Sequence, residues 1–231
     1  MKTIRILALA VGLSLAATAA LAQAPAVTAP RPAPAPSLPA NVAPQGQPVV
    51  SVDLFKDEGM ALFSAQWRIK EAKIVEIPAI SNHMDGYDKT YDIAPHAGEA
   101  GFDDSSWPAM PAKVLGERRG GGKISFIWYR AAFAMPAKVG DLDVTGMRAV
   151  LTVVVDDYAE VWVNGEMPRK AGYVSPGSVQ GFNMPNRVVL TTGVKPGEKE
   201  QVAIFGINGP ISVAPANFLS FREAHIDFYR P

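Results

Sequence analysis

Residues 148–166 constrain the fold of this chain more than any other part of the sequence. Residues 149–155 are almost all apolar and rich in β-branched side chains, which is typical of a strand covered on both faces. Residues 158–163 form a second run of strand character, which ends at Asn164-Gly165, a pair that favours the positive φ angles of a tight turn. We therefore predict two β-strands, joined in a hairpin at Asp156-Asp157, near the centre of a β-sheet core.

Short runs of strand character continue on both sides of this stretch and are separated by Gly and Pro residues. A short helix is predicted at residues 54–63, with Asp53 as its cap. Many short strands with little helix predict an all-β fold, an antiparallel β-sandwich of the jelly-roll type. The further strands, the first of which has a bend near Glu71-Ala72, are predicted at residues 66–77, 124–133, 187–190, 201–208 and 218–228.

Three motifs follow one another along the chain. They are FDDSSW at residues 102–107, WYR at residues 128–130 followed by Phe133, and DDYAEVWVNG at residues 156–165. In residues, order and spacing they resemble the galactose-binding-like jelly-roll domains, which include the sugar-binding domain of glycoside hydrolase family 2 and carbohydrate-binding modules. The segment also resembles a domain that accompanies gluconolactonase-like β-propellers in secreted bacterial proteins. The resemblance implies a β-sandwich and a link to carbohydrate, but a fold does not name a ligand.

The N-terminal residues predict export. Two basic residues precede an apolar run, and Ala20-Leu21-Ala22 has the small-x-small pattern of a cleavage site, so residues 1–22 are predicted to be a signal peptide. A transmembrane anchor is the alternative, although the run is short for one. Residues 23–50 are dominated by Pro and Ala and predict an extended linker. We assign the sandwich to residues 51–231 and expect a periplasmic or secreted bacterial location, with no membrane span after cleavage.

The composition excludes several kinds of chemistry. The chain has no cysteine, which rules out disulfides, thiolate nucleophiles and thiolate metal sites. Its 22 basic and 22 acidic residues balance, so the charge does not favour nucleic acid or an anionic membrane surface as a partner. The sequence has no Gly-x-Ser-x-Gly elbow, and Gly120-Gly121-Gly122 leads into a predicted strand, unlike a phosphate-binding loop. With no catalytic constellation, we predict that the chain is not an enzyme.

Two groups of acidic residues could hold a cation. The first combines histidines and aspartates in a long irregular segment: His83, Asp85, Asp88, Asp92 and His96. The second offers paired carboxylates: Asp103, Asp104, Asp156, Asp157 and Glu160. Imidazole and carboxylate groups bind transition metals, and oxygen ligands alone suit Ca²⁺. The alternative for both groups is structural, with carboxylates that cap turns. We predict no cofactor and leave open a structural Ca²⁺ at Asp156 and Asp157.

The residues best suited to a sugar are predicted to lie in loops at one end of the sandwich. Aromatic faces pack against the C–H face of a pyranose, and Arg and Asn side chains pair with its hydroxyl groups. The candidates are Arg118 and Arg119 in the Gly-rich loop, Tyr173 and Asn183 in a long loop, and Asn208 at the end of a strand. The glycines after the two arginines would let a ligand approach the backbone. Trp128 and Trp162 lie inside predicted strands and are assigned to the core.

These patterns together predict an exported, non-catalytic carbohydrate-binding module that recognises a sugar or related polyol. The first alternative is a structural or protein-interaction module with a vestigial sugar site, which docks to an envelope protein or a partner enzyme. The second is a sugar-lactone hydrolase or an accessory protein of a glycoside hydrolase, which the gluconolactonase-associated resemblance suggests.

Overall fold

The computed structural model describes residues 42–78, 89–122, 124–167, 169–170, 173–174, 179–181, 183–209 and 216–231. All of them belong to the second of two compact units of the chain, Leu38–Pro231. The predicted signal peptide and most of the predicted linker lie outside the described residues. Within the described ranges, no helix is long and apolar enough to cross a membrane.

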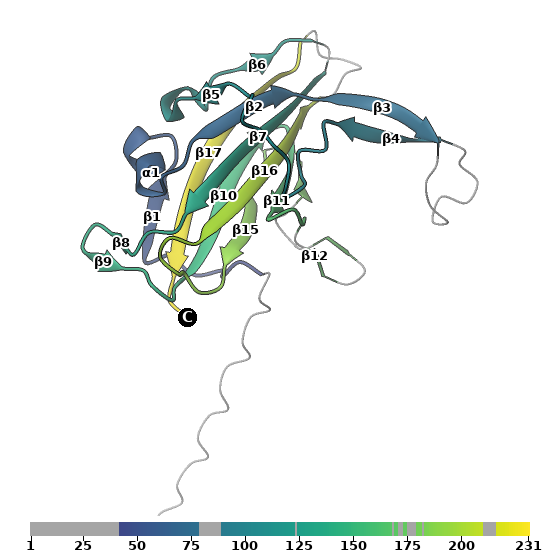
Figure 1. Cartoon of the computed structure of the whole chain (residues 1–231). Helices are drawn as coiled ribbons and strands as arrows, with labels where there is room; N and C mark the ends of the chain where they lie inside the picture. The colour runs from purple at the N-terminus through teal and green to yellow at the C-terminus, as the bar shows by residue number, and fades with distance from the viewer. Residues whose placement is uncertain are drawn as a thin grey trace, which may run out of the picture. The chain divides into compact units, whose positions relative to one another are not determined.

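Two antiparallel β-sheets pack face to face as a sandwich (Figure 1). The first sheet has the order β1 (Val50–Asp53), β17 (Phe218–Tyr229), β10 (Arg148–Asp156) and β15 (Asn186–Thr191), and β6 (Arg119–Gly120) pairs with β17. The second has the order β14 (Val179–Gln180), β11 (Tyr158–Val163), β16 (Lys199–Asn208), β7 (Ser125–Ala134), β2 (Trp67–Glu71) and β5 (Ala109–Met110). The predicted all-β antiparallel sandwich is confirmed.

Smaller elements surround the two sheets. Three two-stranded ribbons are β3 (Lys73–Pro78) with β4 (Lys89–Ala94), β8 (Lys138–Val139) with β9 (Leu142–Asp143), and β12 (Arg169–Lys170) with β13 (Tyr173–Val174). The helices are α1 (Asp57–Leu62) and the 3-10 turn η1 (Ala112–Val114). The helix α1 begins later than predicted, because the Asp53 carboxylate accepts a hydrogen bond from Phe55 N–H at 2.9 Å and turns the chain first. The predicted bend falls at Ala72, between β2 and β3.

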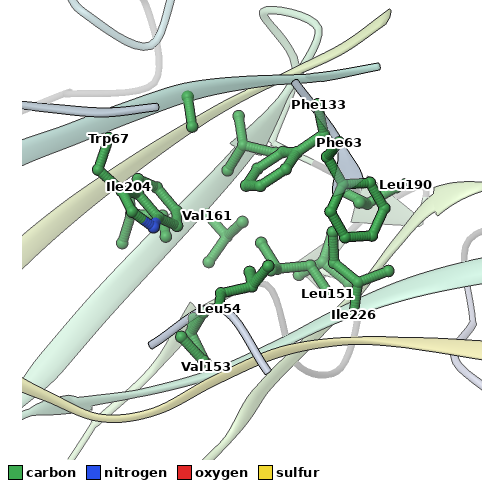
Figure 2. Packing of buried hydrophobic residues seen from close by; sticks show 14 of the residues in the cluster. Leu54, Phe63, Trp67, Phe133, Leu151, Val153, Val161, Leu190, Ile204 and Ile226 are labelled. Carbon is green, nitrogen blue, oxygen red and sulfur yellow. The ribbon is translucent and has the colours of Figure 1, made fainter. Parts of the chain in front are cut away.

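The core fills the space between the sheets with aliphatic side chains from the strands and aromatic side chains at one side (Figure 2). Val153 of β10 and Val161 of β11 are fully buried. The ring of Phe133 meets Phe63 edge-on at 5.7 Å and lies 5.6 Å from Trp67. Each such side chain contributes about 1.5–3 kcal/mol when it leaves water. Both predicted central strands therefore do lie at the centre, each in the interior of its sheet.

Strand β10 is buried on both faces, as its apolar sequence predicts. Its outer face is covered by the first described residues of the chain. Ala43 packs with Val150 and Tyr229, and Arg187 Nη2 donates a hydrogen bond to the Pro44 carbonyl at 2.8 Å. The folded part of the chain therefore begins before the predicted boundary at residue 51.

The outer face of the same sheet carries a polar cluster whose Thr152 and Asp227 are buried and whose His225 is partly exposed. His225 Nε2 lies 3.3 Å from Asp227 Oδ2, and Thr152 Oγ1 donates to the same oxygen at 3.1 Å. The hydrogen bond to Asp227 raises the pKa of His225 above its ordinary value of 6.5. Burial acts to raise the pKa of Asp227, but hydrogen bonds from His225, Ser51 and Thr152 outweigh it and hold this pKa below 3.8. The cluster therefore couples stability to pH.

The predicted hairpin at Asp156-Asp157 is wrong, because β10 and β11 belong to different sheets. The chain crosses from one layer of the sandwich to the other at these two residues. Asp156 forms an ion pair with Arg222 at 2.9 Å, and Asp157 N–H donates to the Ile207 carbonyl at 3.2 Å. The register of β10 against β17 shifts just before the crossing, which bends the strand toward the corner. Local propensity identified both strands, but their partners depend on packing.

Candidate functional site

Aromatic side chains line the outer face of the second sheet, which points away from the core. Residues paired across neighbouring strands lie on the same face. Trp128 of β7 pairs with Phe205 of β16, and their rings lie 5.0 Å apart. Phe126 stacks on Phe205 at 6.2 Å, and Trp162 of β11 pairs with Ala203. These residues form an aromatic surface on which the segment of residues 93–107 packs.

Arg130 fastens that segment to the sheet. Its side chain is only 2% exposed, and its Nε donates to Asp104 Oδ2 at 2.8 Å. Its terminal nitrogens donate to the carbonyls of Ala97, Glu99 and Phe102. Two of the motifs that carry the family resemblance, FDDSSW and WYR, therefore meet in one partly buried ion pair. Asp104 therefore helps to hold this segment on the sheet.

A cavity of about 340 Å³, which we name the tryptophan cavity, lies at this segment. Strand β4 contributes three residues, including Asp92. The following loop contributes His96, Gly98 and Glu99, and β7 and β11 contribute one indole each. The lining residues are Tyr91, Asp92, Ile93, His96, Gly98, Glu99, Trp128 and Trp162. A concave site with aromatic walls and a few convergent polar groups is the usual form of a small-molecule site.

The aromatic groups of the tryptophan cavity differ in exposure. Tyr91 is 69% exposed, Trp162 is half-buried, and Trp128 is only 3% exposed. Gly98 lies against the Trp162 ring so closely that a Cβ at this position would stand 2.8 Å from Cδ2. Glycine is needed here because of this close approach. Within the described residues, neither indole N–H has a hydrogen-bond acceptor.

The charged groups of the cavity form a chain of contacts. Asp92 Oδ2 lies 2.6 Å from His96 Nε2, and His96 Nδ1 lies 3.5 Å from Glu99 Oε1. The hydrogen bond to Asp92 raises the pKa of His96 above its ordinary 6.5, and the same bond lowers the pKa of Asp92 below 3.8. Aromatic faces beside carboxylates can stack on a sugar ring and accept hydrogen bonds from its hydroxyl groups.

The predicted Gly-rich loop adjoins a second cavity, also of about 340 Å³, which Gly120, Gly122 and Ser125 help to line. The guanidinium of Arg119, however, points back to its own chain. It donates to the carbonyls of Val114, Leu115 and Glu117. These contacts engage the donors that we assigned to a sugar, because the arginine binds carbonyls at the end of the 3-10 turn η1 and just after it. The ligand role of Arg119 stays a prediction without support from this geometry.

The other predicted sugar contacts are partly brought together. The Arg118 guanidinium lies 6.0 Å from the Phe218 ring, and Asn208 Nδ2 donates to the Phe218 carbonyl, so both surround one residue at the start of β17. Asn183 has a positive φ of 62° and donates its N–H to the Asp157 carbonyl at 3.0 Å. Tyr173 lies in β13, and its side chain lies outside the described part of the structure. Their ligand roles stay predictions.

Among the described residues, no group of three or more His, Cys, Asp or Glu side chains could hold a metal ion. His83, Asp85 and Asp88 lie outside the described ranges. Asp103 Oδ1 accepts the Ser105 N–H at 2.9 Å and so caps a turn. Glu160 accepts a hydrogen bond from the Tyr158 hydroxyl at 2.7 Å.

Sequence reasoning missed the site that the two tryptophans form. We assigned both to the core, and Trp128 is indeed buried, but in a separate cluster on the outer face of the second sheet. The signal was present in β11, whose burial alternates. Ala159 and Val161 face the core, so Trp162, which is offset by one position, must face outward. Tyr91 and Gly98 carried no comparable pattern.

Comparison with known proteins gives distant and partial likenesses. No protein family matches the sequence, and no characterised protein matches it. Among solved structures, it is similar to Bacteroides uniformis β-glucuronidase 2, with 14% identity and a TM-score of 0.40 over 71% of this chain and 18% of that one. A Faecalibacterium prausnitzii β-glucuronidase has 13% identity and a TM-score of 0.36 over 72% of this chain and 32% of that one. A Xanthomonas citri GH31 α-xylosidase has 10% identity and a TM-score of 0.27 over 79% of this chain and 19% of that one. The chain spans a third or less of the length of these enzymes.

Proposed function

We propose that this chain is an exported, non-catalytic carbohydrate-binding domain and that the tryptophan cavity is its sugar site. The observation that carries the proposal is the combination of three aromatic side chains with the carboxylates of Asp92 and Glu99 around one open cavity. Stacking supplies affinity for the apolar face of a pyranose, and the carboxylates supply direction by accepting hydroxyl protons. Export rests on the signal-like residues 1–22.

The engagement of the carboxylates favours binding over catalysis. Glycoside hydrolysis needs one carboxyl group that donates a proton and a second that acts as nucleophile or base. Asp92 is held by His96, and Asp104 is held by Arg130. The hydrogen bond to His96 lowers the pKa of Asp92, so this carboxylate stays ionised and is a poor proton donor.

The test is a glycan array followed by calorimetric titration of the sugars that bind. Replacement of Trp162 by Ala removes one stacking surface and should weaken binding about ten- to a hundredfold. The matched control is Phe218→Ala, which removes an aromatic ring that is 38% exposed and lies outside the cavity lining. If Trp162→Ala binds sugar as tightly as the wild type, the sugar site lies outside the tryptophan cavity. A wild-type protein that binds no sugar on the array would refute the proposed function.

A specific observation also favours a protein-interaction role as the second candidate. The ribbon of β3 and β4 extends past the end of β2 (Figure 1) and exposes apolar side chains. Ile74, Val75 and Tyr91 are 41%, 42% and 69% exposed. Exposed apolar groups on a ribbon can bind a partner. If envelope proteins are retained by the wild type and lost in Val75→Asp, while no sugar binds, this candidate replaces the first.

A further inference from the structure

Resting on the proposed sugar site, we propose that the tryptophan cavity selects sugars that carry a free amine, such as glucosamine units, over neutral sugars and uronates. The charge of the lining and its aromatic walls lead to this ligand class.

The charge of the lining is negative. Two carboxylates, Asp92 and Glu99, face one imidazole, His96. The net charge of these three groups is therefore −1 when the imidazole is protonated and −2 when it is neutral. Glu99 is the less engaged of the two carboxylates, because its side chain is 69% exposed and its oxygen lies 3.5 Å from His96, against 2.6 Å for Asp92. Glu99 can therefore receive an ammonium group from a ligand.

The aromatic walls favour the same kind of ligand. An ammonium group is attracted to the face of an indole or phenol ring within about 6 Å of its centre. Tyr91 and Trp162 both offer partly exposed rings beside the carboxylates. Trp128 lines the same cavity but is only 3% exposed. The lining thus complements a cation carried on a ring with an apolar face.

The surroundings offer little to an anionic sugar. The lining of the cavity contains no Lys or Arg among the described residues. Arg130, beneath the loop, is committed to Asp104 and to backbone carbonyls. Lys70 is the cross-strand neighbour of Trp128 but is not part of the lining. In this described lining a uronate carboxylate would meet two like charges and no Lys or Arg, which is unfavourable.

The test compares four oligosaccharides of equal length by calorimetric titration of the whole protein: glucosamine, N-acetylglucosamine, glucose and glucuronate oligomers. At about pH 6 an amine with a pKa near that of an α-amino group is protonated. We expect the glucosamine oligomer to bind roughly tenfold more tightly than the glucose oligomer, and this preference to shrink as salt is added. Glu99→Gln should remove most of the preference, whereas Asp141→Asn, which removes an exposed charge outside the cavity, should keep it.

The outcomes separate the two proposals. Tighter binding of the glucosamine oligomer that depends on Glu99 supports amine selection. Equal binding of the glucosamine and glucose oligomers, or tightest binding of the glucuronate oligomer, overturns amine selection and leaves the sugar site standing. Tightest binding of the N-acetylglucosamine oligomer also overturns it, because the acetyl group removes the charge. A wild-type protein that binds none of the four oligomers, and no sugar on the array, overturns both proposals.

Discussion

Replacing Arg130 with Met removes the guanidinium that joins Ala97, Glu99, Phe102 and Asp104 of the cavity segment to the sheet. The apolar stem of the side chain is kept, so the change isolates the polar contacts. Removing one partner of a buried ion pair costs about 3–5 kcal/mol. Asp104 keeps some compensation, because its side chain is 27% exposed and Arg68 Nε lies 3.6 Å away. We therefore expect a loss of about 2–4 kcal/mol in the free energy of unfolding.

This loss converts into a thermal shift. For a domain of roughly 150–250 residues, each kcal/mol lowers the melting temperature by about 2–4 °C, so Arg130→Met should melt about 4–16 °C below the wild type. Circular dichroism measures the melt, and tryptophan fluorescence reports on Trp128 and Trp162 in the same sample. Arg130→Lys keeps the positive charge but loses the planar guanidinium that reaches several carbonyls. Its melting temperature should therefore lie between those of Arg130→Met and the wild type.

Arg118→Met is the matched control, because Arg118 is exposed and its closest recorded contact is the Phe218 ring at 6.0 Å. We expect a change within about 0.5 kcal/mol for this control. If Arg130→Met melts together with the control and with the wild type, the loop does not depend on this arginine, and the account of how the cavity is held is refuted.

Three further predictions test other parts of the structure. Val153→Asp places an unpaired carboxylate at a fully buried position and should cost several kcal/mol, so a near-wild-type thermal midpoint would contradict burial of β10. Gly98→Ala puts a methyl group against the Trp162 ring and should displace the loop, so calorimetry should show weaker sugar binding at an almost unchanged melting temperature. Because the pKa of His225 is raised in the folded protein, this group adds stability below pH 6.5, and the gain is lost as pH rises through its folded-state pKa. Because the pKa of Asp227 is lowered in the folded protein, this group adds stability above pH 3.8, and the gain is lost as pH falls through its folded-state pKa. The midpoint of urea unfolding, plotted against pH, should therefore be highest between these two pKa values. His225→Gln should reduce the fall of the midpoint at higher pH. If this variant leaves the plot unchanged, the His225–Asp227 pair is not its cause.

The sequence predicted a different surface from the tryptophan cavity. It predicted that the Gly-rich loop lets a ligand approach the backbone; the loop does line a second cavity, but its ligand role stays a prediction. The use of Arg119 could not be foreseen, because a guanidinium donates equally well to a ligand or to a carbonyl, and the choice depends on where η1 ends. The tryptophan cavity was missed because its walls come from β4, β7 and β11, which are far apart in the chain.

The sequence alone determined the class of fold and the positions of the main strands, because β-branched runs, Gly and Pro act locally on the backbone. The tertiary structure decided which strands became neighbours. It placed β10 and β11 in different sheets, although they are consecutive in the chain, because the packing of the two layers sets the partners of a strand. It also brought Gly98 against the Trp162 ring, and this contact between distant residues forms part of the wall of the candidate site.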